Sequence, residues 1–397
     1  MKILILSWEI YPIYCGGLGV LVRHLVNELQ AQGHEVSTAV PDSTVLVEDK
    51  KILILKDEIE KQLLNLKPID GLDFKLKNFN LKAFKKVDTQ VTKVYPNNTP
   101  TVAQAYAYAI EEHLKTNNYD VILGMDWLSI PTFQLLKNIN CPIPFSFYIN
   151  GTEVDRNYGG KMSKTSVIIH NLEKKFYNQA DKIYTVSSVS KKVLIKYLNC
   201  KAKQIIIIHN DSEMKSIVNL EQPREDKRIL FLGRLVYQKG LRYLMMAFRK
   251  LLKLDSAAKL SIVGDGEELK MINKYIAKHN LHNYVTLVNW LDGEEKRLAY
   301  ANASLFVMPS VSEPFGLTAL EAIRQGVPTI ASTRCGFTDI VPSTPTFEYR
   351  DTKLFSQLMY RLINSKENSD DLIKIQKKEL NSHNWVLQVE KLINSIQ

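Results

Sequence analysis

Two carboxylates, Glu313 and Glu321, lie eight residues apart in the segment Ser312–Ala322. Pro314 and Gly316 suit a strand-to-helix turn, and the apolar pattern that follows predicts a helix over residues 317–325. Free N–H groups at the start of a helix attract phosphate. Carboxylates beside them accept hydrogen bonds from sugar hydroxyls. The segment therefore offers contacts to a phosphate, a ribose and a second sugar, which are the parts of a nucleotide sugar.

Two cations, Arg234 and Lys239, flank a short loop after an expected strand at 228–232. Ligands of open α/β sheets bind at the carboxyl ends of the strands, so both side chains are placed to hold a diphosphate. Fixed cations stabilise the negative charge that builds on a departing diphosphate without a metal ion. Taken alone, the two residues are typical of a charged surface; beside the Glu313 segment we interpret them as part of a site.

A glycine-rich stretch, Gly16-Gly17-Leu18-Gly19, lies between the first expected strand and the first expected helix. Its backbone can approach a phosphate closely because no side chain intervenes. Gly17 and Gly19 also fit part of a dinucleotide-binding fingerprint with Asp42 as the ribose acid. Val22 replaces the third glycine of that fingerprint, which disfavours a nicotinamide-dependent oxidoreductase.

The turn Val263–Glu267 carries Gly264 and is expected next to Arg234, where a nucleotide base could rest.

The sequence gives little support for metal-dependent or nucleophilic catalysis. The sequence has no Asp-x-Asp triplet, no Ser-His-Asp arrangement and no cysteine nucleophile with its base. We therefore expect that the protein needs no metal ion and no cofactor. His170 lies in the expected helix at 166–177, and we expect it to have a structural role. The four scattered cysteines disfavour a disulfide framework or a zinc site and suit a reducing cytosol.

The length of 397 residues suits two domains with a core each. Hydrophobic residues make up 45% of the chain and charged residues 24%, as in ordinary soluble proteins. The first apolar run meets Trp8 and Glu9 at once, so it is expected to be a buried strand rather than a signal peptide. No run approaches the length of a transmembrane helix. We expect a cytoplasmic protein.

The formal net charge of +10 is unevenly distributed. Residues 156–203 carry eleven Lys or Arg against Glu173 and Asp181. This stretch is either a solvated helical surface or a face for an anionic partner. Few aromatic residues are interleaved to stack bases, so an anionic membrane surface, contacted peripherally, is favoured over nucleic acid.

Apolar runs alternate with helical periods along the chain, which predicts α/β domains with parallel sheets covered by helices on both sides. In the first half, strands are expected at 3–7, 36–40, 119–123, 144–149, 182–186 and 205–208, and helices at 19–32, 102–115, 166–177 and 190–198. In the second half, strands are expected at 228–232, 259–263, 284–288, 305–308 and 328–331, and helices at 241–252, 267–280, 317–325 and 385–396.

This pattern predicts two Rossmann-like domains, at 1–211 and 228–380, joined by a polar linker at 212–227. The amphipathic C-terminal segment 381–397 is expected to be a helix that packs back on the first domain. Segment 44–95 is the least regular part of the chain. It is compatible with a strand pair, an acceptor-binding insert or a membrane-facing lobe.

These pieces, in this order, resemble the retaining glycosyltransferases of the GT-B fold over nearly the whole chain. That large family includes sucrose synthases and many lipid and polysaccharide glycosyltransferases, and glycogen and starch synthases are related to it. The Glu313/Glu321 segment is the most specific match, followed by Arg234 with Lys239. Further matches lie in the N-terminal half: Ser7-Trp8-Glu9-Ile10-Tyr11-Pro12 with Gly16-Gly17-Leu18-Gly19, Gly124-Met125-Asp126-Trp127, Asn150-Gly151-Thr152-Glu153 with Arg156, and Ala180-Asp181-Lys182 with Val186-Ser187.

The resemblance implies that the second domain binds most of the donor and that the first faces the acceptor. Arg234 and Lys239 would hold the diphosphate, and Glu321 would take the ribose hydroxyls. Glu313 would lie near the hydroxyls of the transferred sugar. The Gly17–Gly19 loop would close over the diphosphate, and the backbone amides of Phe315, Gly316 and Leu317 would meet sugar or phosphate. Asp126, Glu153 and Arg156 would face the acceptor. Such enzymes retain the anomeric configuration and need no metal or protein base.

Several positions depart from the family pattern. Asn150 stands where the family usually has a His that contacts the donor sugar, and Asn cannot carry charge. Tyr14 replaces a Lys of the glycogen-synthase branch, Asn210-Asp211 replaces Asn-Gly, Cys335-Gly336-Phe337 replaces a Gly-Gly pair, and Asn289 replaces a glycine.

The function expected is transfer of a hexose, with glucose favoured, from a nucleotide sugar to a glycan, as in α-glucan elongation by glycogen or starch synthases. Three alternatives stay open. One is a hexosyltransferase that acts on a lipid-linked or cell-surface glycan at an anionic membrane. The second is a donor-binding subunit with impaired catalysis, and the third is a nucleotide-sugar epimerase.

Overall fold

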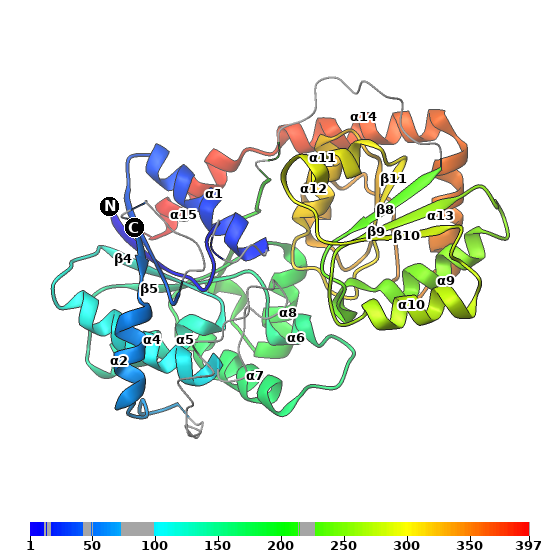
Figure 1. Ribbon diagram of the computed structural model, residues 1–397. Coiled ribbons are helices and arrows are strands. Elements are labelled where there is room, and N and C mark those ends of the chain that lie inside the picture. Colours follow the sequence, from blue (N-terminus) through cyan, green and yellow to red (C-terminus); the bar gives the residue numbers. More distant parts are fainter. Residues whose placement is uncertain are drawn as a thin grey trace.

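The computed structural model describes residues 1–11, 13, 17–42, 49, 51–72, 99–212, 214 and 227–396. Two parallel sheets, each covered by helices, form the two lobes of Figure 1. The expected α/β class and the GT-B arrangement of two Rossmann-like domains are confirmed.

The first domain is built on a seven-stranded sheet in the order β3-β2-β1-β4-β5-β6-β7, and all pairs are parallel. Ile3 of the central strand pairs with Val36 on one side and with Val121 on the other. The strands are β1 (Lys2–Leu6), β2 (Glu35–Val40), β3 (Ile52–Ile54), β4 (Val121–Met125), β5 (Phe145–Ile149), β6 (Ile183–Thr185) and β7 (Ile205–Ile207).

Alternate residues of β1 belong to two separate cores, because side chains along a strand point to opposite faces of the sheet. Ile3 and Ile5 pack in one core, and Leu4 and Leu6 pack in the other. The helices of this domain are α1 (Gly17–Ala31), α2 (Lys56–Leu64), α4 (Thr99–Leu114), α5 (Ile130–Asn138), the single turn α6 (Glu153–Arg156), α7 (Lys164–Phe176) and α8 (Ser188–Leu198).

The second domain is built on a six-stranded parallel sheet in the order β10-β9-β8-β11-β12-β13. Its strands are β8 (Arg228–Leu232), β9 (Lys259–Val263), β10 (Val285–Val288), β11 (Leu305–Met308), β12 (Thr329–Ser332) and β13 (Thr346–Phe347). Its helices are α9 (Leu241–Leu251), α10 (Leu269–Lys278), α11 (Gly293–Ala301), α12 (Leu317–Arg324), α13 (Thr352–Asn364) and α14 (Lys366–Ser382). Short 3₁₀ turns lie at Tyr237–Lys239 and Gly336–Asp339.

The last helix, α15 (Trp385–Ile396), crosses back to the first domain and lies beside α1 in Figure 1. The Trp385 ring stacks on His24 with 4.8 Å between centroids. Gln32 donates to the carbonyl of Val386 at 3.2 Å. The chain thus passes between the two lobes twice, which limits how far they can separate.

Direct hydrogen bonds also join the two domains. The hydroxyl of Ser187 donates to the carbonyl of Pro314 at 2.6 Å, and Ser188 gives Asp339 both its amide and its hydroxyl at 2.6 Å. The hydroxyl of Ser312 donates to Asp155 at 2.7 Å. These contacts surround the turn before α12 and fix it against the first domain.

Some elements differ from the sequence prediction. No helix was expected between the strand at 144–149 and the helix at 166–177, but Thr152 and Asp155 form a capping box that starts α6. In segment 44–95 the described residues are 49 and 51–72, where β3 pairs parallel with β2 and α2 follows. The rest of that segment, Gly16 and all of the linker except Ser212, Met214 and Lys227 lie outside the described residues.

Candidate active site

A cleft of about 650 Å³ lies between the domains, where loops from the carboxyl ends of strands in both sheets meet. Ten of the fourteen predicted site residues line it, so the tertiary structure brings together residues that are far apart in the chain. They are Gly17, Asp126, Asn150 and Arg156 from the first domain, and Arg234, Lys239, Glu313, Phe315, Gly316 and Leu317 from the second. The roles of these residues remain predictions.

The turn into α12 forms one wall of the cleft. Gly316 is the residue before the helix, with φ of 111°, and an added Cβ would lie 2.8 Å from the sulfur of Met308. Only glycine suits this backbone and this space. Leu317 and Thr318 follow in the first turn of the helix and line the cleft. Their amides have no intrahelical acceptor, so this wall can present free N–H groups to an anion.

Lys239 and Glu313 form an ion pair in the cleft, with 2.5 Å between Nζ and Oε2. Their side chains are only 19% and 10% exposed, and Ser310 donates to the same carboxylate oxygen at 3.2 Å. Gly240, with φ of 72°, follows Lys239 and lets the loop approach Pro309, whose carbonyl oxygen would lie 2.0 Å from an added Cβ. The two charges are therefore held by the backbone as well as by each other.

Glu313 is also fixed through its main chain. Its amide donates to the carbonyl of Arg334 at 3.0 Å, and its carbonyl accepts the amide of Gly336 at 3.0 Å. Cys335, between these two residues, is fully buried, and burial raises the pKa of its thiol to about 12. The thiol of Cys335 is therefore protonated near neutral pH.

Arg234 lies on the cleft wall at the end of β8 and is exposed. Among the described residues, no side chain forms an ion pair or hydrogen bond with its guanidinium. The loop that carries it is held by the amide of Leu235, which donates to the carbonyl of Asp265 at 2.7 Å. A guanidinium that is available on a fixed loop can bind a phosphate as a two-pronged donor.

Gly264 does not line the cleft, and its role in binding the donor remains a prediction. Its φ is 139°, and an added Cβ would lie 2.0 Å from the carbonyl oxygen of Gly233. The glycine is needed for the close packing of two turns rather than for contact with a ligand. Its neighbours Asp265, Gly266 and Glu267 line the cleft instead.

On the opposite wall, Asp126 holds the loop that carries Asn150. Its Oδ1 accepts the amides of Asn150 at 2.7 Å and of Gly151 at 3.3 Å. Asp126 is buried and its φ is 51°, which is unusual for a residue other than glycine. Burial raises the pKa of Asp126 to about 6, although the charge of Arg156 and the two amides act against the rise.

The side chain of Asn150 is buried at the cleft, yet neither its Nδ2 nor its Oδ1 has a hydrogen-bond partner among the described residues. An unpaired buried amide costs about 1–3 kcal/mol. Such a group is suited to a ligand that supplies the missing donor and acceptor, as a sugar hydroxyl does.

Arg156 lines the cleft and is held by Glu153, with 3.1 Å between Nη1 and Oε2. Glu153 itself is buried and does not line the cleft; its Oε1 also accepts the side-chain amide of Asn157 at 2.9 Å. Glu153 thus holds Arg156 and Asn157 in place, and its contact with an acceptor remains a prediction. The buried Glu173 accepts the backbone amide of Glu153 at 3.0 Å, and burial raises the pKa of Glu173 well above its ordinary value.

The two predicted glycines of the N-terminal loop differ. Gly17 lines the cleft, and among the described residues no atom of another segment lies within 4 Å of the position that a Cβ would occupy. Gly19 is buried inside α1, and its carbonyl accepts the amide of Tyr11 at 3.0 Å. The structure therefore supports a ligand-facing position for Gly17 and a packing role for Gly19.

Glu321 is not among the lining residues. It lies one helical turn behind Leu317 and accepts hydrogen bonds from Lys296 at 2.8 Å and from the buried hydroxyl of Tyr300 at 2.7 Å. The predicted contact with ribose therefore requires hydroxyls that reach past Leu317 and Thr318. Lys296 and Tyr300 were missed because the sequence prediction had no helix at 293–301.

Trp290 and Glu9 also line the cleft and were not predicted as site residues. Trp290 lies two residues after the expected strand at 284–288, and it is 37% exposed. A tryptophan just beyond the carboxyl end of an expected strand is the sequence feature that could have drawn attention to it. Among the described residues, no group of three or more His, Cys, Asp or Glu is placed to hold a metal ion. No described helix has the length and apolarity to cross a membrane.

Comparisons with known proteins agree with this geometry. Residues 15–210 match Glycosyltransferase Family 4, and residues 212–379 match Glycosyl transferases group 1. An uncharacterized glycosyltransferase of Methanocaldococcus jannaschii is 28% identical over 360 residues, which cover 86% of this chain and 83% of that protein. The glycogen synthase of Mycobacterium tuberculosis is 26% identical over 86% of this chain and 80% of its own length. Sucrose-phosphate synthase from Thermosynechococcus elongatus superimposes with a TM-score of 0.77 at 20% identity, over 100% of this chain and 98% of that one.

Proposed function

Since this chain belongs to the glycosyltransferases of the GT-B fold, we propose that it transfers a hexose, with retention of configuration, from a nucleotide sugar to a glycan. The observation that carries the proposal is the position of Lys239 and Glu313. They form an ion pair on one wall of the cleft, and the unpaired amide of Asn150 lies on the opposite wall.

In this proposal Arg234, Lys239 and the amides at the start of α12 bind the diphosphate. Negative charge grows on the diphosphate as its bond to the sugar breaks, and groups that are already in place stabilise that charge most effectively. Glu313 accepts hydrogen bonds from hydroxyls of the transferred sugar, and Asn150 contacts the same sugar from the other domain. Glu321 is assigned to the ribose.

The step itself needs no protein base. The bond between the anomeric carbon and the phosphate oxygen breaks, and a bond to the acceptor oxygen forms on the same face of the sugar. The proton of the acceptor hydroxyl passes to the leaving diphosphate. In this mechanism Asp126 remains a positioning residue, because its carboxylate already accepts the amides of the Asn150 loop.

Glucose from UDP- or ADP-glucose, added to an α-glucan, is the first candidate reaction. It is supported by the resemblance of Ser7–Pro12 to the glycogen-synthase loop and by the similarity to a glycogen synthase. The test is a thermal-shift series with UDP, ADP and GDP and their sugars, because a ligand that binds only the folded state raises its stability. The nucleotides with one of the three bases should raise the melting temperature most, and Glu321→Ala should abolish that rise.

NMR of the product then shows whether the anomeric configuration is retained. An inverted product would contradict the proposed mechanism.

A lipid-linked or cell-surface acceptor is the second candidate. Two neighbouring helices, α7 and α8, expose Val167, Ile168 and Ile195, which are 44%, 37% and 39% exposed, among exposed lysines such as Lys192 and Lys196. Exposed apolar side chains can insert into a bilayer, and exposed lysines are attracted to its anionic headgroups. Co-sedimentation with phosphatidylglycerol vesicles that fades with salt, and is lost in Lys192→Glu/Lys196→Glu, would favour this acceptor. Binding to neutral glucan without vesicle binding would favour the first.

Asn150 also keeps open a donor-binding subunit with impaired catalysis, which a partner chain would complete. Turnover by the purified single chain separates the possibilities, since hydrolysis or transfer of the donor would exclude the impaired subunit. A rate that rises in Asn150→His would identify the substitution as a handicap.

A further inference from the structure

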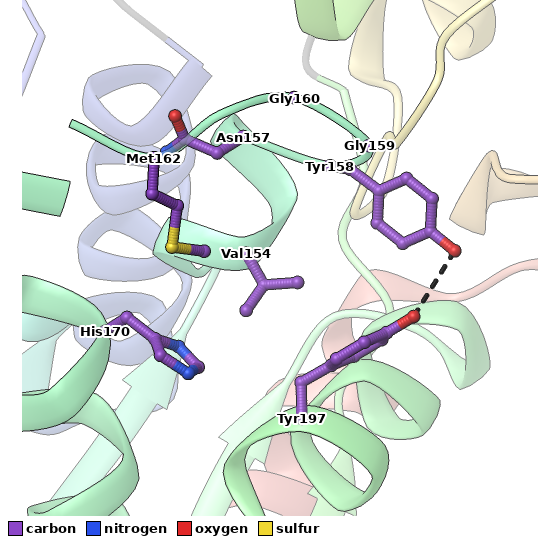
Figure 2. Close-up of a pocket in the computed structure, with 8 residues that line it drawn as sticks. All are labelled: Val154, Asn157, Tyr158, Gly159, Gly160, Met162, His170 and Tyr197. Atoms are coloured by element: carbon purple, nitrogen blue, oxygen red, sulfur yellow. Dashed lines mark hydrogen bonds between the residues drawn. The ribbon is translucent and has the colours of Figure 1, made fainter. Parts of the chain in front are cut away.

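A second pocket, of about 380 Å³, lies in the first domain (Figure 2). The single turn α6 separates the two cavities. Asp155 and Arg156 line the cleft, whereas Val154 and Asn157 line the pocket. A long acceptor that enters the cleft beside Arg156 therefore passes close to this second cavity.

Two tyrosines form the side of the pocket that faces the second domain. The rings of Tyr158 and Tyr197 meet edge to face, with 6.2 Å between centroids and 85° between planes, and their hydroxyls are 3.5 Å apart. The ammonium of Lys196 lies over the Tyr197 ring, 5.1 Å from its centroid. Flat aromatic surfaces of this kind are apolar in the middle and polar at the edge.

The opposite side of the pocket combines apolar and polar groups. Figure 2 shows His170 extending from α7 toward Val154 and Met162, across from Tyr197. The Nδ1 of His170 is buried and has no hydrogen-bond partner among the described residues. Burial lowers the pKa of His170, with a smaller effect from Lys174, which favours the neutral ring; a neutral imidazole offers a donor and an acceptor.

The pocket is also connected to the turn that carries Glu313. Arg334 of the second domain donates to the hydroxyl of Tyr158 at 2.6 Å, and its guanidinium lies over that ring, 4.9 Å from the centroid. The carbonyl of Arg334 accepts the amide of Glu313 at 3.0 Å. One residue thus touches both the tyrosine pair and the turn beside the proposed donor site.

We propose that this pocket binds a sugar unit of the acceptor glycan at a distance from the hydroxyl that is glycosylated. A sugar ring has apolar C–H faces and a rim of hydroxyls. The pocket matches it with aromatic and aliphatic walls and a few polar groups, which is the usual character of a small-molecule site. This inference rests on the proposed function, because it assumes a glycan acceptor.

The test measures binding of maltoheptaose, cellohexaose and chitohexaose by calorimetry, with UDP, ADP and GDP measured on the same samples. At least one oligosaccharide should bind the wild-type chain. Tyr197→Ala should weaken that binding about five- to tenfold, as expected for a lost aromatic contact, whereas Tyr197→Phe should change it less than twofold. Tyr360→Ala, which removes an exposed ring on α13, is the matched control and should leave binding unchanged.

Two outcomes would overturn the inference while leaving the proposed function intact. In the first, a nucleotide binds but none of the three oligosaccharides does. In the second, an oligosaccharide binds the wild type and Tyr197→Ala equally well. Failure of all three nucleotides to bind would instead count against the proposed function. Retention of nucleotide binding by Tyr197→Ala shows that the variant is folded.

Discussion

Lys239 and Glu313 show how individual residues prepare the cleft for a charged ligand. Their pair is largely shielded from water, and Ser310 completes the hydrogen bonds of the carboxylate. A diphosphate that enters beside Lys239 meets an ammonium that is already oriented, so little reorganisation is needed. Arg234 differs because it is exposed and its guanidinium has no ion-pair or hydrogen-bond partner among the described residues.

Arg234→Gln and Lys239→Met form a matched pair of variants. We expect both to lower kcat/KM about a hundredfold to a thousandfold, because each removes a cation from the developing charge. Only Lys239→Met should also destabilise the protein, by roughly 1–3 kcal/mol, since it leaves the buried Glu313 carboxylate without its ion-pair partner. Steady-state kinetics and urea unfolding separate the two effects. Equal stability losses in both variants would contradict this account.

Asn150→Ala should have opposite effects on activity and stability. The side-chain amide is buried and unpaired among the described residues, so its removal should leave the free energy of unfolding unchanged or raise it by about 1 kcal/mol. Turnover should fall about a hundredfold if the amide contacts the transferred sugar. Loss of stability together with activity would show instead that Asn150 supports the loop.

Asp126 should make stability depend on pH. The folded protein binds this proton more tightly than the unfolded chain, because burial raises the pKa from 3.8 to about 6. The stability that the proton contributes is complete below the unfolded pKa and is lost as pH rises through about 6. Relative to Asp126→Asn, the wild-type free energy of unfolding should fall by about 1 kcal/mol between about pH 5 and pH 7.5. Urea unfolding of both proteins at the two pH values measures this difference. If the wild type and Asp126→Asn differ in free energy of unfolding by the same amount at both pH values, the prediction is contradicted.

At the scale of elements, the cleft depends on short connections between strands and helices. Glycine is required where these connections approach other backbone segments, as at Gly240, Gly264 and Gly316. Each added Cβ would lie 2.0 to 2.8 Å from an atom of another segment. The helices that follow are thereby held with their first turns close to the ends of the strands.

Gly316→Ala should destabilise the protein by roughly 2 kcal/mol or more, because alanine disfavours φ of 111° and its Cβ would press on Met308. The turn into α12 should shift, and turnover should fall with stability. Gly17→Ala is the matched control, since no atom of another described segment lies within 4 Å of its added Cβ and its φ is not left-handed. Chemical denaturation of both variants gives the comparison; similar losses would contradict the assignment.

At the scale of the whole molecule, the cleft exists only while the two domains are held together. Burial would raise the pKa of Asp339, but hydrogen bonds from His209 and Ser188 outweigh it and hold the pKa below its ordinary value. His209 Nε2 lies 3.2 Å from this carboxylate, and both His209 and Ser188 belong to the first domain. Asp339 of the second domain is therefore bonded to two residues of the first domain, and these bonds hold the two domains together near the turn that precedes α12.

Asp339→Ala should shift the protein toward a more open arrangement. It removes charge-assisted hydrogen bonds worth about 1.5–3 kcal/mol each across the interface. Small-angle X-ray scattering should show a larger radius of gyration, and kcat/KM should fall while each domain remains folded. Asp181→Ala, at an exposed position on the first domain, is the control. An unchanged radius of gyration with reduced activity would argue against a role in closure.

Much of the architecture could be predicted from local sequence patterns. The apolar runs at 228–232, 259–263 and 305–308 correspond to β8, β9 and β11, and the amphipathic segment 385–396 to α15. Strands buried on both faces are nearly continuous apolar runs, so they are recognisable without knowledge of their neighbours. The order Arg234, Lys239, Glu313 along repeated strand–helix units likewise predicts one shared sheet edge, because parallel strands end on the same side.

Only the tertiary structure decided which polar groups face the cleft and which are used for packing. Glu321 is bound by Lys296 and Tyr300, and Gly264 is placed against Gly233. The isolation of the Asn150 amide and the pocket beside Tyr158 likewise depend on segments that are distant in the chain. Local propensity fixes where strands and helices begin and end, whereas the partners of a buried side chain are fixed by how separate elements pack.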